Sequence, residues 1–192
     1  MILRDRIDIF AFGLVLTALL LAQPIVAKAG DSQSDGLVEL TLAFAQAEWD
    51  GDTIPKGQQC LEFDGQGDSP AIAVGNIPPT ANSLVLAFSD ESYSPCDKGG
   101  HGVISYRIAE GTKEVTVPSI PGQTFDLPES FSLIREHCGV HLSMQRGAYI
   151  GPCPGLGNHY YVTVSARRDT GDGAEPTVLG EARLEIGTYR WD

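Results

Sequence analysis

The segment 147–161, which reads GAYIGPCPGLGNHYY, constrains the fold of this chain more than any other stretch. Three glycines and two prolines fall within positions 151–157, and neither a helix nor a central strand tolerates that mixture. We therefore predict a shaped loop here. Such a loop can leave backbone N–H groups pointing one way, which suits an anion. The alternative is a tight turn before a core strand.

A strand is predicted directly after this loop, at residues 162–166. His159 and Tyr161 lie two positions apart in the approach to that strand, so we expect both side chains on the same side. An imidazole supplies a titratable donor and a phenol supplies a hydroxyl. These two residues are the first candidates for binding an anion.

The first 29 residues have the pattern of a secretory signal peptide. Two arginines precede an apolar run at residues 9–22, and an A-x-A site at residues 27–29 predicts cleavage before Gly30. The run is short for a membrane span, so we expect no stable membrane anchoring after cleavage. An uncleaved anchor is the alternative. We therefore expect a periplasmic or secreted protein.

The remaining chain is expected to form a single domain. Residues 30–36 are small and polar and predict a flexible leader, whereas residues 37–192 show no internal repeat and no second core. The whole chain carries a formal net charge of −12. Bulk charge of this sign attracts neither nucleic acid nor an anionic membrane, so we expect no nucleic-acid partner. Any anion must be held by local geometry.

Four cysteines follow the signal segment: Cys60, Cys96, Cys138 and Cys153. An even number in an oxidising compartment predicts two disulfides, and three pairings remain open. His137, Cys138 and His141 form a cluster of metal-ligand types. Because a zinc site needs a fourth ligand or an open position, and Cys138 is expected in a disulfide, we predict no metal site.

Apolar patterning predicts a mainly β chain with one or two short helices. Strands are expected at residues 37–44, 71–74, 83–88, 101–108, 115–117 and 178–186, with an edge strand at 61–63. The only clear helix is predicted at residues 129–138, because Pro128 suits its first turn and Gly139 its end. Asp90 follows the most apolar strand, a frequent place for a functional carboxylate and equally for a cap or turn.

Several segments resemble one known family. The segment 147–161 resembles a G-Y-x-G-P-C-P-P-x-G-x-H-R-Y pattern, and residues 51–56 before Cys60 resemble a D-G-x-x-I-P-K opening. The stretch from Ser69 through residues 77–86 and the closing residues 178–189 resemble further segments. Over about residues 40–190, the chain is similar to phosphatidylethanolamine-binding proteins, of the bacterial Raf-kinase-inhibitor-like branch.

The resemblance implies a two-sheet β fold with a small anion pocket. The positions that match the family's pocket residues are Asp90, His101, Gly151, Pro152, His159 and Tyr161. Two imidazoles and a phenol can donate to a phosphate, and Asp90 can orient or charge a neighbouring histidine. The implied function is an exported protein that binds a small anionic ligand, phosphate-like or phospholipid-headgroup-like. A regulator of a kinase-like or hydrolase partner protein is the alternative.

The chain departs from the family pattern after the strand predicted at residues 83–88 and within the strand predicted at 101–108. Glu91 and Ser92 replace a Pro and an Asp, and Gly102 replaces a Trp. Tyr106 lies five residues after His101, where the pattern suggests four. Either a bulge absorbs one residue, or His101 lies off the pocket, since a one-residue slip turns a side chain to the other face.

Nothing in the chain is typical of a catalytic nucleophile. No Ser or Thr is clearly placed beside a base, and no segment resembles a nucleophile elbow. We therefore expect a binding protein that is not an enzyme and has no cofactor. A weak hydrolase that uses the histidine pair with Asp90, or Cys153 if its thiol is free, is the alternative.

Overall fold

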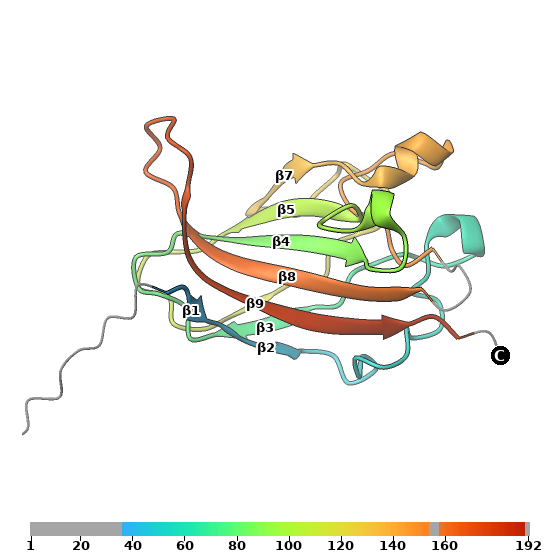
Figure 1. Ribbon diagram of the computed structural model, residues 1–192, viewed down its shortest axis with the longest axis horizontal. Coiled ribbons are helices and arrows are strands. Elements are labelled where there is room, and N and C mark those ends of the chain that lie inside the picture. The colour runs from blue at the N-terminus through green and yellow to red at the C-terminus, as the bar shows by residue number, and fades with distance from the viewer. Residues whose placement is uncertain (1–35, 154–157, 191–192) are drawn as a thin grey trace, which may run out of the picture. The chain divides into compact units, whose positions relative to one another are not determined.

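Two β-sheets make up most of the regular structure in the computed structural model, which describes residues 36–153 and 158–190. One sheet has six strands in the order β1-β9-β8-β4-β5-β7, and the other has three in the order β2-β3-β6 (Figure 1). The strands are β1 (Val38–Glu39), β2 (Thr41–Phe44), β3 (Ile72–Gly75), β4 (Ser83–Asp90), β5 (Gly102–Arg107), β6 (Val115–Val117), β7 (Phe131–Arg135), β8 (His159–Arg168) and β9 (Thr177–Thr188). The predicted mainly β, two-sheet fold is confirmed.

The helices of the described residues are three short 3-10 turns. They are η1 (Leu61–Phe63), η2 (Ser94–Cys96) and η3 (Cys138–Leu142). Within residues 36–153 and 158–190, no helix has the length and apolarity needed to cross a membrane. The predicted signal peptide at residues 1–29, and the leader up to residue 35, lie outside the described residues.

The hydrophobic core is built from the facing sides of both sheets. β4 lies at the centre of the large sheet, between β5 and β8, and its Leu84, Leu86 and Phe88 are buried. Ile72 and Val74 of the small sheet belong to the same buried cluster. Because side chains alternate along a strand, the intervening residues of β4, such as Ser83 and Ser89, point to the opposite face, which we call the outer face.

The helix predicted at residues 129–138 is wrong. Phe131–Arg135 form β7, which pairs with β5 at the edge of the large sheet. Phe131 is buried and packs on Tyr106 with ring centroids 4.8 Å apart. Ser130 has a positive φ of 76°, so the backbone leaves the helical region just before the strand. Pairing with a distant strand therefore overrides the local capping pattern.

Two further predicted strands differ in detail. Residues 61–63 form the 3-10 turn η1, whose C-terminal Asp64 takes the left-handed conformation, so the predicted edge strand is wrong there. The single strand predicted at residues 37–44 is divided between the two sheets, as β1 and β2. The division falls at Leu40, whose side chain is buried in the core.

Two disulfides are formed, which confirms the predicted number. Cys60 pairs with Cys153, and Cys96 pairs with Cys138. The first bond ties η1 to the Gly/Pro loop, and the second ties η2 to η3. Both bonds therefore join loops beyond the end of β4.

Candidate functional site

A cavity of about 240 Å³ lies where β4 ends and β8 begins. We call it the Asp90 cavity. Its lining residues are Phe63, Asp90, Tyr93, Cys96, His101, Cys138, Gly139, Leu142, Met144, Ile150, Cys153 and Asn158. The wall is thus largely apolar, with both disulfides in it, and its polar groups come chiefly from Asp90, His101 and Asn158.

Asp90 ends β4 with its side chain buried, only 2% exposed. Its Oδ1 accepts the backbone N–H of Ser92 at 2.9 Å, and its Oδ2 accepts the Asn158 side-chain amide at 2.6 Å. A buried carboxylate needs such donors, since an unpaired one costs several kcal/mol (about 3–5). The two bonds fix the carboxylate in the cavity wall.

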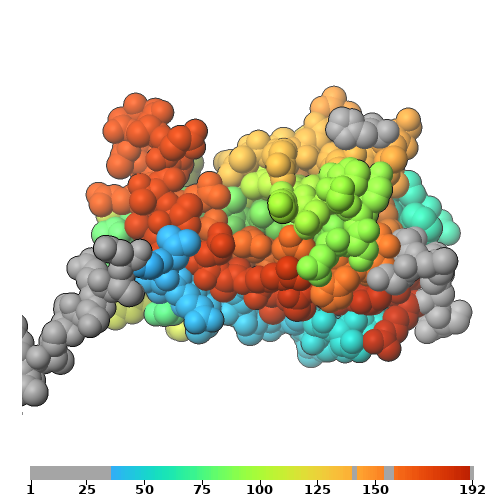
Figure 2. All heavy atoms as spheres, viewed as in Figure 1, coloured from blue at the N-terminus to red at the C-terminus, as the bar shows by residue number. Residues whose placement is uncertain are grey.

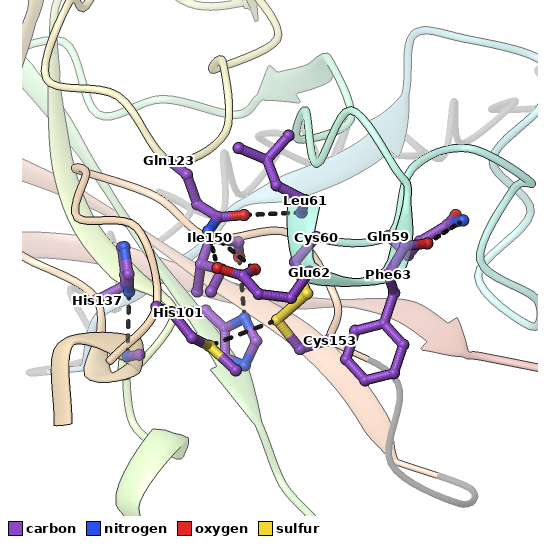
Figure 3. The surroundings of a disulfide bond; sticks show 12 residues. Gln59, Cys60, Leu61, Glu62, Phe63, His101, Gln123, His137, Ile150 and Cys153 are labelled. Atoms are coloured by element: carbon purple, nitrogen blue, oxygen red, sulfur yellow. Dashed lines mark hydrogen bonds between the residues drawn. A yellow bond between two sulfur atoms is a disulfide. The ribbon is translucent and has the colours of Figure 1, made fainter. Parts of the chain in front are cut away.

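His101 precedes β5 and is 5% exposed. Its Nδ1 donates to the carbonyl of Ile150 at 2.9 Å, and its own carbonyl accepts the Ile150 N–H at 3.0 Å (Figure 3). Burial lowers the pKa of the imidazole, and the bond to Ile150 and the charge of Asp90 oppose this shift. The ring is therefore neutral near pH 7, and Nε2 is the nitrogen left for a ligand.

The spacing of five residues between His101 and Tyr106 left two explanations open, a bulge or a His101 that lies off the pocket. Neither is right as stated. β5 pairs with β4 in continuous register from Gly102 to Arg107, and the irregularity nearby lies opposite Val103 and Ile104, in β7. His101 nevertheless lines the Asp90 cavity. Gly102 has a φ of 122°, and a Cβ there would lie 2.3 Å from the carbonyl oxygen of Ala148. No larger residue fits directly after His101.

His159 and Tyr161 lie on the outer face of β8, not in the cavity. Asp90 is paired across the sheet with Tyr160, so Tyr160 shares its face and the two neighbours of Tyr160 point away. The predicted grouping of His159 and Tyr161 with Asp90 and His101 is therefore not formed. The expectation that His159 and Tyr161 share one side with each other agrees with the structure.

An ionic cluster surrounds these two residues on the outer face. His159 Nδ1 lies 3.3 Å from Glu91 Oε2, and its Nε2 lies 3.6 Å from Glu185 Oε2. The guanidinium of Arg183 stacks on the Tyr161 ring at 3.6 Å and pairs with both carboxylates. These hydrogen bonds, first of all that of Arg183, lower the pKa of Glu91. The charge of Arg183 is therefore paired with carboxylates inside this cluster.

Asn158 and Tyr160, and not His159 and Tyr161, lie on the side of Asp90: Asn158 lines the cavity and Tyr160 is buried beside it. Asn158 binds Asp90, and the Tyr160 hydroxyl donates to the Cys153 carbonyl at 2.7 Å. Burial raises the pKa of the Tyr160 phenol. Asn158 and Tyr160 are also two positions apart and so share one side of the strand. The family-like pattern pointed to His159 and Tyr161, each one residue later in the sequence.

Gly151 and Pro152 shape the loop and do not line the cavity themselves. A Cβ on Gly151 would lie 2.6 Å from Gly67 Cα, and the Pro152 carbonyl accepts the Cys60 N–H at 2.9 Å. The adjacent Cys60–Cys153 disulfide closes the same contact (Figure 3). The predicted run of loop N–H groups extends through residues 154–157, outside the described residues.

Metal-ligand types gather at two places in the described part of the chain: Cys96, His101 and Cys138, and Cys60, Glu62 and Cys153. The cysteines of both groups are joined in disulfides, and a disulfide sulfur is not the thiolate that binds zinc. His137 is buried with its Nδ1 accepting the Gly139 N–H at 3.1 Å. The side chain of His141 lies outside the described part.

Comparison with known proteins gives a similarity to solved structures. No protein-family model and no curated protein sequence matches the chain. A crystal structure of a phosphatidylethanolamine-binding protein homologue from Chlamydia trachomatis is similar at a TM-score of 0.48 and 21% identity, over 80% of this chain and 99% of the homologue. That homologue is named for the family which the sequence segments resemble. A likeness at this level assigns neither a ligand nor an activity to this chain.

Proposed function

We propose that this chain is an exported binding protein that holds the anionic group of a small ligand in the Asp90 cavity. The observation that carries the proposal is a buried carboxylate and a buried imidazole, Asp90 and His101, in the wall of one cavity. Buried ionisable groups that converge on a cavity are typical of binding sites and uncommon in a plain hydrophobic core.

His101 supports anion binding through proton uptake. Burial holds its pKa low in the free protein, while the negative charge of Asp90 acts in the opposite direction. A bound anion adds a second negative charge, which raises the pKa again and turns Nε2 into a charged donor. Affinity for an anion is therefore expected to rise as the pH falls through the pKa of the liganded imidazole.

The remaining wall favours a ligand with an apolar part next to the anionic group. Met144 and Ile150 lie in the wall, and Phe63, Tyr93 and Leu142 are exposed large side chains that also line it. A ligand that covers large exposed apolar side chains around a cavity removes them from water, which makes the free energy of binding more favourable. An aryl or alkyl phosphate combines both features.

We infer binding without turnover. The described lining residues include no Ser or Thr, and the lining cysteines are joined in disulfides. Asp90 accepts hydrogen bonds on both of its oxygens, and His101 Nδ1 is bonded to Ile150, so we assign both groups to holding the ligand.

Export rests on the signal-like residues 1–29 and on the two disulfides, which persist in oxidising compartments. The secreted or periplasmic form is expected to begin at Gly30. Intact-mass measurement of the protein recovered from the periplasm or medium tests this, and a mass that includes the first 29 residues would contradict it.

The binding proposal is tested by NMR titration of the mature, oxidised protein with phenyl phosphate and with inorganic phosphate. We expect shifts at Ile150 and Asn158, tighter binding of phenyl phosphate, and at least about tenfold weaker binding by His101→Gln, since a charged donor is lost.

His159→Gln is the matched control, because it removes an imidazole from the outer face of β8, outside the cavity lining. We expect its affinity for phenyl phosphate to stay within about twofold of the parent protein. Loss of binding by His159→Gln with no effect of His101→Gln would overturn the assignment of the site to the Asp90 cavity.

A further inference from the structure

The outer face of the large sheet carries a second recess at the far end of β4 from Asp90. It encloses about 690 Å³ and is bordered by β7 on one side and by the β8–β9 connection, residues 169–176, on the other. In Figure 2 the red β8–β9 connection rises beside the yellow-orange β7 segment, with a hollow between them. We call this recess the outer groove.

Two arginines flank a serine across the floor of the outer groove. Ser83 of β4 is paired with Arg107 of β5 on one side and with Arg167 of β8 on the other. Residues directly opposite one another in a sheet share a face, and all three line the groove. With neighbouring strands about 4.8 Å apart, the two arginine Cα atoms lie about 10 Å apart. Both guanidinium groups can therefore reach one group bound above Ser83.

Neither arginine forms an ion pair within the described part of the protein. Arg146, Arg183 and Arg190 form ion pairs with carboxylates, whereas neither Arg107 nor Arg167 has one within 4.0 Å among the described residues. The bond that Arg167 makes is from Nε to the Ser165 hydroxyl at 3.1 Å. Two like charges placed together without a counter-charge are unfavourable, although the chain has 25 acidic residues from which to supply one.

The carboxylates near the groove do not fill this role. Asp169 lines the groove, but its Oδ1 accepts the Gly171 N–H at 2.8 Å within its own turn. Glu175 lines the outer wall and is exposed. Asn82 and Asp169 exchange two hydrogen bonds, of 2.7 and 2.9 Å, which fix the wall to the start of β4. The groove is therefore held open beside two arginines that form no ion pair with these carboxylates.

We propose that the outer groove binds a tetrahedral dianion, the phosphate or sulfate group of a small hydroxylated ligand, between Arg107 and Arg167. Guanidinium groups bind such oxyanions through paired hydrogen bonds. The hydroxyls of Ser83, Ser105 and Ser132 also line the groove and suit the hydroxyl groups of a sugar. The volume lies within the range of small-molecule sites, about 300–1,000 Å³. This site is separate from the Asp90 cavity.

The test is an NMR titration of the mature, oxidised protein at constant ionic strength with glucose 6-phosphate, glucose, inorganic phosphate and inorganic sulfate. We expect glucose 6-phosphate to shift the signals of Ser83, Arg107 and Arg167, and glucose alone to leave them unchanged. Between about pH 5 and pH 7, phosphate-ester binding should strengthen as the second proton leaves, while sulfate binding should not. The pH arm thus distinguishes the two oxyanions.

Arg107→Gln and Arg167→Gln should each weaken glucose 6-phosphate binding at least about tenfold, because each removes a charge-assisted pair of hydrogen bonds. Arg168→Gln removes the same charge from the next, exposed position of β8, outside the groove lining, and should change the affinity less than about twofold. Equal weakening by Arg168→Gln, or no shift at the groove residues, would overturn the proposal.

His101→Gln separates this site from the proposed function. Groove signals should titrate normally in that variant, whatever happens at Ile150 and Asn158. Loss of the groove response in His101→Gln, with folding intact, would contradict two independent sites.

Discussion

The imidazole of His101 meets the phenol ring of Tyr160 edge-on, with ring centroids 5.3 Å apart and an angle of 75° between the planes. Edge-on contacts of this kind place the positive ring edge of one partner against the π-face of the other. Tyr160 comes from β8 and is paired with Asp90 of β4. The contact therefore joins the Gly/Pro loop, the end of β4 and His101 in one wall.

Exchange of Tyr160 for Phe should weaken both the fold and the binding of phenyl phosphate. The change removes the hydrogen bond to the Cys153 carbonyl, which should cost about 0.5–1.5 kcal/mol of unfolding free energy. Because that carbonyl belongs to the cavity wall, we expect phenyl phosphate to bind about threefold or more weakly. Urea unfolding and the NMR titration measure the two effects.

Tyr161→Phe is the matched control, since its hydroxyl donates to Asp97 Oδ1 on the outer face. A similar loss of about 1 kcal/mol is expected in unfolding free energy, with phenyl phosphate affinity unchanged. If Tyr161→Phe lowers the affinity and Tyr160→Phe does not, the ligand contacts the outer face.

Two buried histidines should make the protein less stable as the pH falls below neutrality. Burial lowers the pKa of both His101 and His137 in the folded state, so the unfolded chain binds more protons at mildly acidic pH. Each histidine then contributes a slope of at most about 1.4 kcal/mol per pH unit, with unfolding free energy falling as pH falls below about 6.5.

Urea unfolding between about pH 7.5 and pH 5.5 measures this slope without titrating the carboxylates, whose ordinary pKa values lie near 4. His137→Gln should reduce the slope. An unfolding free energy that rises toward pH 5.5, or a slope that His137→Gln leaves unchanged, would refute the assignment.

Gly102→Ala should destabilise the cavity wall strongly. Gly102 has a φ of 122°, and the added Cβ would lie 2.3 Å from the backbone oxygen of Ala148. Both the strained φ and the clash act together, so we expect a loss above about 2 kcal/mol in unfolding free energy.

Gly111→Ala separates strain from clash, because Gly111 also has a positive φ, of 84°, but open space at its Cβ. Its loss should stay near 1 kcal/mol, about the cost of a left-handed conformation for a non-glycine residue. Comparable losses for the two variants would show that the contact with Ala148 is unimportant.

The two disulfides should contribute unequally to stability. The Cys60–Cys153 disulfide spans a sequence separation of 93 residues and the Cys96–Cys138 disulfide one of 42. Because a longer closed loop loses more entropy in the unfolded chain, the first disulfide should add about 0.7 kcal/mol more to the unfolding free energy than the second. Replacing either pair by serines should cost about 2–5 kcal/mol. Non-reducing peptide mapping should recover these two links, and any crossed link would contradict the pairing.

Local sequence was sufficient for the framework of this protein. Alternating and continuous apolar segments located β3, β4, β5, β6 and β9 because the period-two pattern and β-branched content act residue by residue. Gly151 and Pro152 excluded regular structure in the same local way, and residues 151–153 are neither helix nor strand. An even number of cysteines indicated two disulfides, although it left their pairing open.

Tertiary structure decided everything that depends on pairing between distant segments. Residues 131–135 became a strand because β5 offered a partner, and no local rule describes that partner. The face that each side chain occupies was decided in the same way: Asp90 pairs with Tyr160, so Asn158 and Tyr160 lie with His101, while His159 and Tyr161 point outward. Side chains alternate between the two faces at every residue, so a shift of one position in the pairing register exchanges the residues on each face. The sequence does not specify the register to within one position, and it therefore leaves the composition of the site undetermined.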